Sequence, residues 1–176
     1  MRKLANEELG RITVEQFKTV EKIPVVVVLD NVRSLNNVGS AFRTSDAFRV
    51  EKIFLCGITG TPPHRDIQKT ALGATDSVSW AHVQDTVHLV KELKAKGYII
   101  IAVEQAEKSV MLNDFYAKAS SKYCLIFGNE VFGVNQEVIN QCDSVIEIPQ
   151  EGTKHSLNIS VSMGILLWEF WKQLKA

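Results

Sequence analysis

The sequence predicts an α/β fold in which helices flank a mostly parallel β-sheet. Short apolar runs rich in β-branched residues, such as VVVVL, YIIIAV and YCLIF, recur between helix-like stretches. These runs are apolar throughout and do not alternate with polar residues, which is typical of strands covered on both faces. The repeated strand–helix order favours parallel strands with helical crossovers.

The expected elements follow one another along most of the chain. We expect strands at Val25–Leu29, Lys52–Cys56, Ser77–His82, Tyr98–Val103, Tyr123–Phe127 and Ser144–Ile148. We expect helices at Val38–Phe48, Asp66–Leu72, Thr86–Lys96, Gln136–Gln141 and Asn158–Leu174. A short amphipathic helix is expected over about residues 1–22. Because no linker, repeat or low-complexity stretch interrupts this order, we expect a single domain over residues 1–176.

Composition excludes several classes of protein. A chain of 176 residues with 45% hydrophobic and 23% charged residues suits a globular domain with its own core. The longest apolar run, Val25–Leu29, is too short to span a bilayer. The first ten residues are polar and carry no secretory signal, so we expect a cytoplasmic protein with no membrane partner.

The three cysteines, Cys56, Cys124 and Cys142, are scattered and form no CxxC pair. This spacing favours neither disulfides nor a zinc site, and we expect buried reduced thiols and no metal. Twenty basic residues balance twenty acidic ones. A net charge of zero argues mildly against a nucleic-acid partner, although a local basic patch remains compatible with it.

Three polar segments follow predicted strands, at the edge of the sheet where α/β proteins bind ligands. The first is DNVRSLNNVGSAFR, residues 30–43. Asn37 precedes a helix whose start includes Gly39, and a helix N-terminus together with the Arg43 guanidinium suits an anion. The alternative is that Asn37 caps the helix and Arg43 lies on its solvated face.

The second segment, GNEVFG at residues 128–133, directly follows an apolar strand. Its two glycines allow the backbone to approach a ligand closely. The alternative is a tight strand-to-helix turn in which Glu130 is favoured by the helix dipole. No GxGxxG follows any strand, so the usual dinucleotide fingerprint is absent.

The third segment, IPQEGTKHSLN at residues 148–158, leads into the long apolar helix. Ser156 and Asn158 lie at the mouth of that helix, and Ser156 as a simple cap is the alternative interpretation. His155 beside them is titratable, but a lone histidine is weak evidence for catalysis.

Together and in order, the motifs NNVGSAFRTSDAF, LIFGNEVFGV and IEIPQEGTKHSLNISVSMGILL resemble those of the SpoU (TrmH-like) branch of the SPOUT RNA 2′-O-ribose methyltransferases. The resemblance covers roughly residues 25–168. It implies a Rossmann-like sheet with a C-terminal trefoil knot, S-adenosyl-L-methionine as cofactor and a homodimer. It also implies RNA as the substrate, with tRNA favoured over rRNA because no appended RNA-binding domain is evident.

The resemblance also assigns site residues. It implies catalytic roles for Arg43, Asn37, Glu130, Ser156 and Asn158. It implies cofactor contacts for Val103, Glu104, Phe127, Gly128, Asn129, Gly133, Ile148, Pro149, Ser156 and Leu157. Two other functions remain open at this point: a non-catalytic RNA-binding or assembly protein that keeps the fold, and an NAD oxidoreductase, against which the missing GxGxxG argues.

The chain departs from the family pattern at two places. Many relatives read AFG where this chain has Phe48-Arg49, and many carry glycine where it has Val131. Neither departure removes a polar side chain to which a role is assigned. They bear on the conformation of the loops and the identity of the substrate, and not on the reaction. In the last helix, Trp168, Phe170 and Trp171 are expected either at a subunit interface or in the core.

Overall fold

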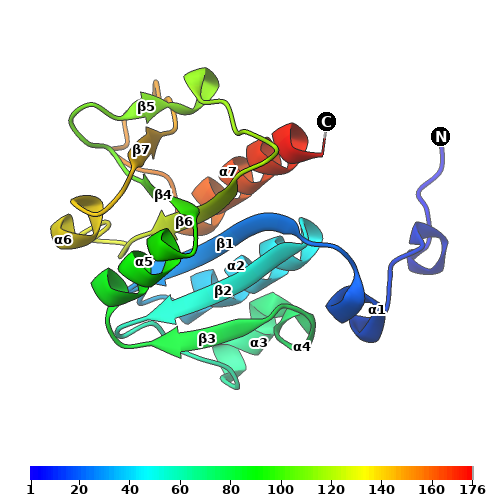
Figure 1. The fold of residues 1–176 in the computed structure, drawn as a ribbon. Helices are drawn as coiled ribbons and strands as arrows, with labels where there is room; N and C mark the ends of the chain where they lie inside the picture. The colour runs from blue at the N-terminus through cyan, green and yellow to red at the C-terminus, as the bar shows by residue number, and fades with distance from the viewer. Residues whose placement is uncertain (176) are drawn as a thin grey trace.

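A seven-stranded, fully parallel sheet forms the centre of the computed structural model, which describes residues 1–175. The strands are β1 (Ile23–Asp30), β2 (Val50–Cys56), β3 (Trp80–Val83), β4 (Tyr98–Val103), β5 (Val110–Met111), β6 (Lys122–Phe127) and β7 (Ser144–Glu147). Their spatial order is β3-β2-β1-β6-β4-β7-β5 (Figure 1). The predicted α/β class and parallel sheet are confirmed.

The apolar run of β1 shows why its residues do not alternate with polar ones. Val25, Val27 and Leu29 belong to the hydrophobic core on one face of the sheet. Val26 and Val28 belong to the core on the opposite face. Since successive side chains of a strand point to opposite faces, a strand buried on both faces must be apolar at every position.

The helices lie on both faces of the sheet (Figure 1). One core contains residues of α2 (Leu35–Ala47), α3 (Arg65–Ala71) and α7 (Ile159–Leu174). The other contains residues of α5 (Thr86–Ala95) and α6 (Gln136–Ile139). Of the aromatic residues of α7, Phe170 is buried and stacks on Phe115, whereas Trp168 is half exposed.

The strand predicted over Ser77–His82 is wrong at its start. Ser77 instead ends α4 (Ala74–Ser77), and the strand begins at Trp80. The Ser77 hydroxyl donates to the Ala74 carbonyl oxygen and to the Asp46 carboxylate. These two bonds hold Ser77 in a helical turn. The two-residue strand β5 was too short to be recognised from hydrophobic pattern.

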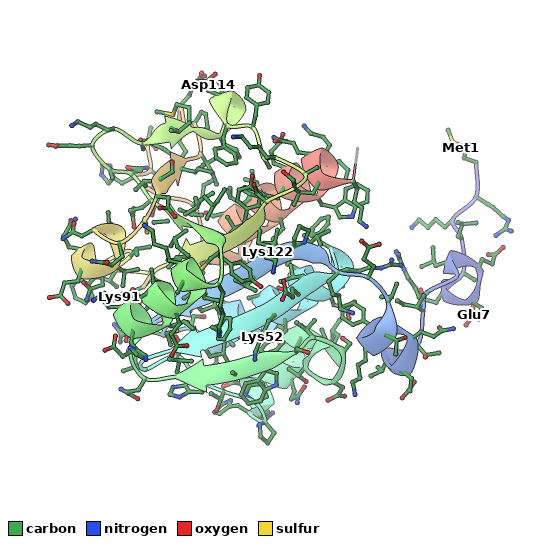
Figure 2. The ribbon with its side chains drawn as sticks, viewed as in Figure 1. Met1, Glu7, Lys52, Lys91, Asp114 and Lys122 are labelled. Carbon is green, nitrogen blue, oxygen red and sulfur yellow. The ribbon has the colours of Figure 1, made fainter. Side chains whose placement is uncertain are left out.

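The N-terminal helix predicted over about residues 1–22 is also not one helix. The structure has a 3₁₀ turn, η1 (Asn6–Leu9), and a short helix, α1 (Val14–Thr19). Phe17 of α1 is buried in the core, while residues 1–13 are all exposed. Figure 2 shows the side chains of Met1 and Glu7 standing apart from the sheet. A second 3₁₀ turn, η2 (Leu112–Asp114), follows β5.

The departure at Phe48-Arg49 now has a structural explanation. Phe48 is the C-cap of α2, and Arg49 follows it with a φ of +53°. Glycine is the usual residue in this left-handed position after a helix. Arg49 adopts the same conformation at a cost of about 1–2 kcal/mol.

After β3 the chain stops adding strands at one edge of the sheet and continues on the other side of β1. It builds β1, β2 and β3 outward to one edge and then crosses to β4 on the other side of β1. Ligands of such sheets bind beyond the carboxyl ends of the strands at this switch point. None of the helices within residues 1–175 is long and apolar enough to cross a membrane.

Candidate functional site

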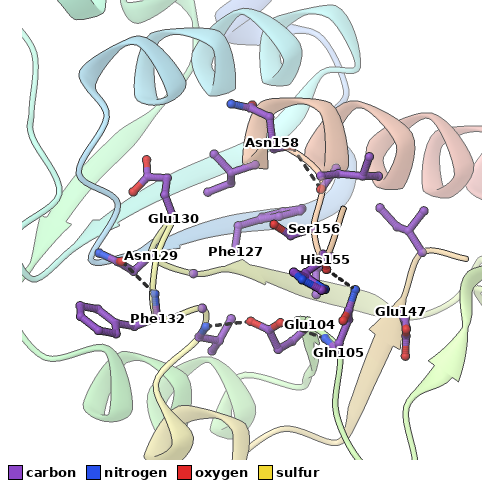
Figure 3. Close-up of a pocket in the computed structure, with 18 of the residues that line it drawn as sticks. Glu104, Gln105, Phe127, Asn129, Glu130, Phe132, Glu147, His155, Ser156 and Asn158 are labelled. Carbon is purple, nitrogen blue, oxygen red and sulfur yellow. Dashed lines mark hydrogen bonds between the residues drawn. The ribbon is translucent and has the colours of Figure 1, made fainter. Parts of the chain in front are cut away.

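A pocket with a volume of about 730 Å³ lies at the carboxyl ends of β4, β6 and β7 (Figure 3). This volume is within the range of small-molecule and cofactor sites. The pocket brings together the second and third polar segments. Its predicted residues are Val103, Glu104, Phe127, Gly128, Asn129, Glu130, Gly133, Ile148, Ser156, Leu157 and Asn158. Pro149 was expected here as well, but it is not among the lining residues.

The loop of residues 128–133 is fixed by hydrogen bonds within itself. The backbone of Asn129 both donates to and accepts from the backbone of Gly133, each over 2.9 Å. The Asn129 side-chain oxygen accepts from the amides of Val131 and Phe132. Its side-chain nitrogen donates to the Asn31 carbonyl oxygen over 2.8 Å. The loop is therefore rigid and is tied to the end of β1.

The two glycines of this loop serve its own folding. A Cβ on Gly128 would lie 2.1 Å from the backbone of Gly133 and Val134. A Cβ on Gly133, whose φ is +69°, would lie 2.1 Å from a Glu104 carboxylate oxygen. The close approach predicted from the sequence is thus real, but the loop approaches its own backbone and Glu104.

Glu130 binds the N-terminus of α2. Its carboxylate accepts from the amides of Arg33 and Ser34, over 2.9 and 3.0 Å, and from the Asn37 side chain over 2.9 Å. Burial alone would raise the pKa of Glu130, but these hydrogen bonds outweigh it and lower the pKa below its ordinary value. The anion at this helix start is therefore a carboxylate of the protein, not an external phosphate.

Asn37 and Asn158 join the first segment to the third. The Asn158 side-chain nitrogen donates to the Asn37 side-chain oxygen over 3.2 Å. The sequence had offered Asn37 and Ser156 as possible helix caps. In the structure Ser34 caps α2 and Asn158 caps α7. Asn37 and Ser156 are not caps. Asn37, Glu130 and Asn158 thus form one chain of hydrogen bonds, hereafter the Asn37–Glu130–Asn158 network.

Arg43 is not part of this network. It lies on the exposed side of α2 and is not among the pocket-lining residues. Within residues 1–175 it makes no side-chain hydrogen bond or ion pair that the structure records. Six residues separate it from Asn37, so the two side chains point about 120° apart around the helix at 3.6 residues per turn. The exposed position of Arg43 agrees with the alternative that it lies on the solvated face of this helix.

Residues that sequence reasoning missed also line the pocket. Gln105 follows β4, and its side-chain nitrogen donates to the His155 carbonyl oxygen over 2.8 Å. This bond ties the third segment to the end of β4 (Figure 3). Val131 and Phe132 line the pocket from the loop tip. Two apolar residues inside a polar loop were a signal that could have drawn attention to them.

The charges of the pocket have one sign. Glu104, Glu130 and Glu147 line it, and no lysine or arginine does so among residues 1–175. Such a pocket favours a cationic ligand and disfavours the pyrophosphate of a dinucleotide. Within the described residues 1–175, no cluster of three or more His, Cys, Asp or Glu side chains is arranged to hold a metal ion.

Relatives of known name match much of the chain. An RNA-modifying relative from Aquifex aeolicus, a tRNA (guanosine(18)-2′-O)-methyltransferase, is 36% identical over 92 residues, which are 52% of this chain and 42% of that protein. A 23S rRNA (guanosine-2′-O-)-methyltransferase RlmB from Ralstonia nicotianae is 30% identical over 108 residues, which are 61% of this chain and 42% of that protein. The matches therefore span less than half the length of these relatives.

Solved structures share the fold. The TrmH/SpoU tRNA modifying enzyme of A. aeolicus superposes with a TM-score of 0.80 at 28% identity, over 92% of this chain and 80% of that one. An AdoMet-bound rRNA methyltransferase from Sinorhizobium meliloti also has a TM-score of 0.80, at 27% identity, over 90% of this chain and 60% of that one.

The family model of the SpoU rRNA Methylase family matches residues 24–168. This range contains all three polar segments and nearly coincides with the extent of the resemblance seen in the sequence. The chain belongs to the SpoU methylase family.

Proposed function

We propose that the protein is an S-adenosyl-L-methionine-dependent RNA methyltransferase that modifies ribose 2′-hydroxyl groups. The observation that carries this proposal is the Asn37–Glu130–Asn158 network, which joins all three family motifs beside one pocket. A fold kept only for binding RNA would not require these polar groups to converge on a cavity of cofactor size.

The pocket suits S-adenosyl-L-methionine in charge and shape. The cofactor carries a cationic sulfonium, and three glutamates with no lysine or arginine line the cavity among residues 1–175. Apolar side chains of Val103, Ile148 and Leu157 offer contacts to an adenine ring, and Glu104 lies beside the glycine loop. The relative from S. meliloti was solved with AdoMet bound, which supports the same ligand here.

The site residues have two roles in catalysis: some orient the substrate, and Arg43 stabilises negative charge. The bound cofactor supplies a methyl group that is open to in-line displacement. The attacking hydroxyl must lose its proton, which requires a base or stabilisation of the developing negative charge. Arg43 is assigned to hold an RNA phosphate and to stabilise charge at the 2′-oxygen, because a guanidinium has no lone pair with which to accept a proton. Asn37, Ser156 and Asn158 orient the ribose and the loops.

The substrate is proposed to be RNA, with tRNA tested before rRNA. The curated relatives act on both classes, as their names state. Arg33 precedes α2 and Arg43 lies in its C-terminal half; both are exposed and supply local positive charge despite the zero net charge. Phosphate contacts need such local charge rather than an overall excess.

A homodimer is proposed, with α7 at its interface. Val161, Ile165 and Trp168 are exposed on α7 at spacings of four and three residues, which places them in one stripe. Apolar stripes of this kind typically mark an interface. Arg43 does not line the pocket of its own chain. We therefore propose that it acts on RNA bound there, or at the pocket of a second copy of the chain.

The finer features of fold and location are proposals as well. A trefoil knot over the C-terminal part is supported by the way the segments at 128–133 and 148–158 converge on one pocket. A single domain over 1–176 is supported by one sheet shared by all strands. A cytoplasmic location is supported by three free cysteines, of which Cys56 and Cys124 are buried.

Two assays test the proposal. Calorimetric titration with S-adenosyl-L-methionine in excess chelator is expected to show saturable binding without metal. Incubation with tritiated methyl donor and bulk small RNA is expected to label the RNA. Binding without labelling would favour a non-catalytic RNA-binding protein, and absence of binding would contradict the assignment.

A further inference from the structure

Two apolar side chains stand in solvent at the edge of the pocket. Val131 and Phe132 form the tip of the 128–133 loop, hereafter the loop tip, and are 66% and 84% exposed. Neither belongs to a hydrophobic core.

The loop tip is held in place before any ligand binds. The amides of Val131 and Phe132 both donate to the Asn129 side-chain oxygen, over 2.9 and 3.1 Å. On one side Glu130 is bound to the start of α2, and on the other Asn129 and Gly133 close the loop. Rigid presentation lowers the entropy lost when a partner binds.

The Phe132 ring lies at the rim of the pocket and is largely exposed. In Figure 3 the Phe132 ring lies on the outer side of the loop and points away from Glu104 and Ser156. Arg33 is next to this surface, because its amide donates to Glu130 over 2.9 Å. The Arg33 side chain is exposed and makes no recorded ion pair within residues 1–175.

We propose that the loop tip is a stacking platform for an unpaired nucleobase of the RNA substrate, beside the ribose to be methylated. Proteins read RNA loops and single strands by stacking unpaired bases on aromatic side chains. The Arg33 guanidinium binds a neighbouring phosphate. This inference rests on the proposed function and narrows its substrate to nucleotides outside a continuous helix.

A nucleobase could come from either of two sources, the RNA or the adenine of the cofactor. Phe132 lies at the rim of the pocket, is 84% exposed and points away from Glu104 and Ser156 in Figure 3, which favours the RNA over the adenine of the cofactor. The two sources are separated by measuring RNA and cofactor binding independently.

The test compares Phe132→Ala and Phe132→Trp with wild type and with Tyr116→Ala. Tyr116 is 79% exposed and is not among the pocket-lining residues, so its variant is the matched loss of an exposed aromatic ring. With bulk small RNA and tritiated methyl donor, Phe132→Ala is expected to raise the KM for RNA by roughly 5- to 100-fold. Phe132→Trp and Tyr116→Ala are expected to behave as wild type, and the loss in Phe132→Ala is expected to be larger for RNA than for the cofactor.

Several results would overturn the proposal. An unchanged KM for RNA in Phe132→Ala would show that no base stacks there. Weaker cofactor binding with unchanged RNA binding would assign the ring to adenine, and a change in light-scattering mass would assign it to a contact between copies. Filter binding of the same small RNA gives an independent readout of the loop tip. If wild type binds that RNA but transfers no methyl group, the proposed function fails while the stacking proposal is still decided.

Discussion

The side chains of Asn37 and Asn158 are hydrogen-bonded across 3.2 Å, although 121 residues separate them in the chain. Asn37 also donates to Glu130, so turning its amide over would place the oxygen against the Glu130 carboxylate and the nitrogen against the Asn158 nitrogen, and both contacts would be lost. The orientation of each residue in the network therefore depends on the other two.

Two substitutions of Asn158 distinguish the effects of its two hydrogen bonds. As the cap of α7 it accepts from the Ser160 amide over 2.8 Å, and as a donor it binds Asn37. Asn158→Ala is expected to lower the free energy of unfolding by about 0.5–2 kcal/mol, since it removes the cap. Asn158→Asp keeps the cap oxygen but loses the donor, so its stability should stay near wild type while its methylation rate falls. Thermal unfolding and methylation assays check this, and full activity in Asn158→Asp would contradict a role for the network.

The lowered pKa of Glu130 predicts a pH dependence of stability. A carboxyl group whose pKa is lower in the folded state contributes stability above its unfolded value of about 4.3, and this contribution is lost as the pH falls through the folded value. Wild type should therefore exceed Glu130→Gln in stability at neutral pH, and the difference should shrink below about pH 4.

Denaturant unfolding across this pH range measures the effect. Glu21→Gln is the control, because Glu21 is exposed and makes no recorded side-chain hydrogen bond or ion pair within residues 1–175. Its curve should run parallel to that of wild type. A Glu130→Gln curve that is also parallel would show that the carboxylate contributes no charge-dependent stability.

The assembly prediction concerns the exposed stripe of α7. Wild type is expected to have twice the 19.7 kDa mass of one chain at micromolar concentration. Ile165→Glu places a charge in the stripe and should yield monomers, whereas Tyr116→Glu should remain dimeric. Light scattering distinguishes the two. A fully active wild-type monomer would rule out a site completed between subunits.

The prediction for Arg43 separates charge stabilisation from cofactor binding. Arg43→Ala is expected to slow single-turnover methylation by at least ~10²-fold, the effect of removing a donor to the transition state. Arg43→Lys should recover little, because an ammonium lacks the planar fork of a guanidinium. Cofactor affinity should hardly change, since Arg43 does not line the pocket. Equal rates in all three proteins would mean that Arg43 only covers a solvated helix face.

The sequence predicted the parallel sheet and most of the pocket, for identifiable physical reasons. A strand buried on both faces must be apolar at every position, as Val25–Leu29 is, and its loops must converge at one edge of the sheet. Local pattern does not encode which side chain binds which. The contact between Gln105 and His155 depends on the relative placement of segments that lie 50 residues apart in the chain.

The same limit explains the errors. The sequence shows that Arg43 lies six positions after Asn37, but not which surface of the folded protein its side chain meets. The strand start at Ser77 was misjudged because a serine can close a helical turn through a partner, Asp46, that lies 31 residues away. Phe132 was overlooked because a single aromatic residue in a polar loop has no periodicity.

The most direct test of ribose methylation is the chemical position of the transferred methyl group. Bulk small RNA is incubated with the protein and tritiated S-adenosyl-L-methionine, then hydrolysed completely with alkali. Alkaline cleavage requires a free 2′-hydroxyl, so a 2′-O-methylated nucleotide stays joined to its neighbour. The label is expected in alkali-resistant dinucleotides, and Arg43→Ala is expected to lose most of it. Label recovered in mononucleotides would place the methyl group on a base and contradict the account.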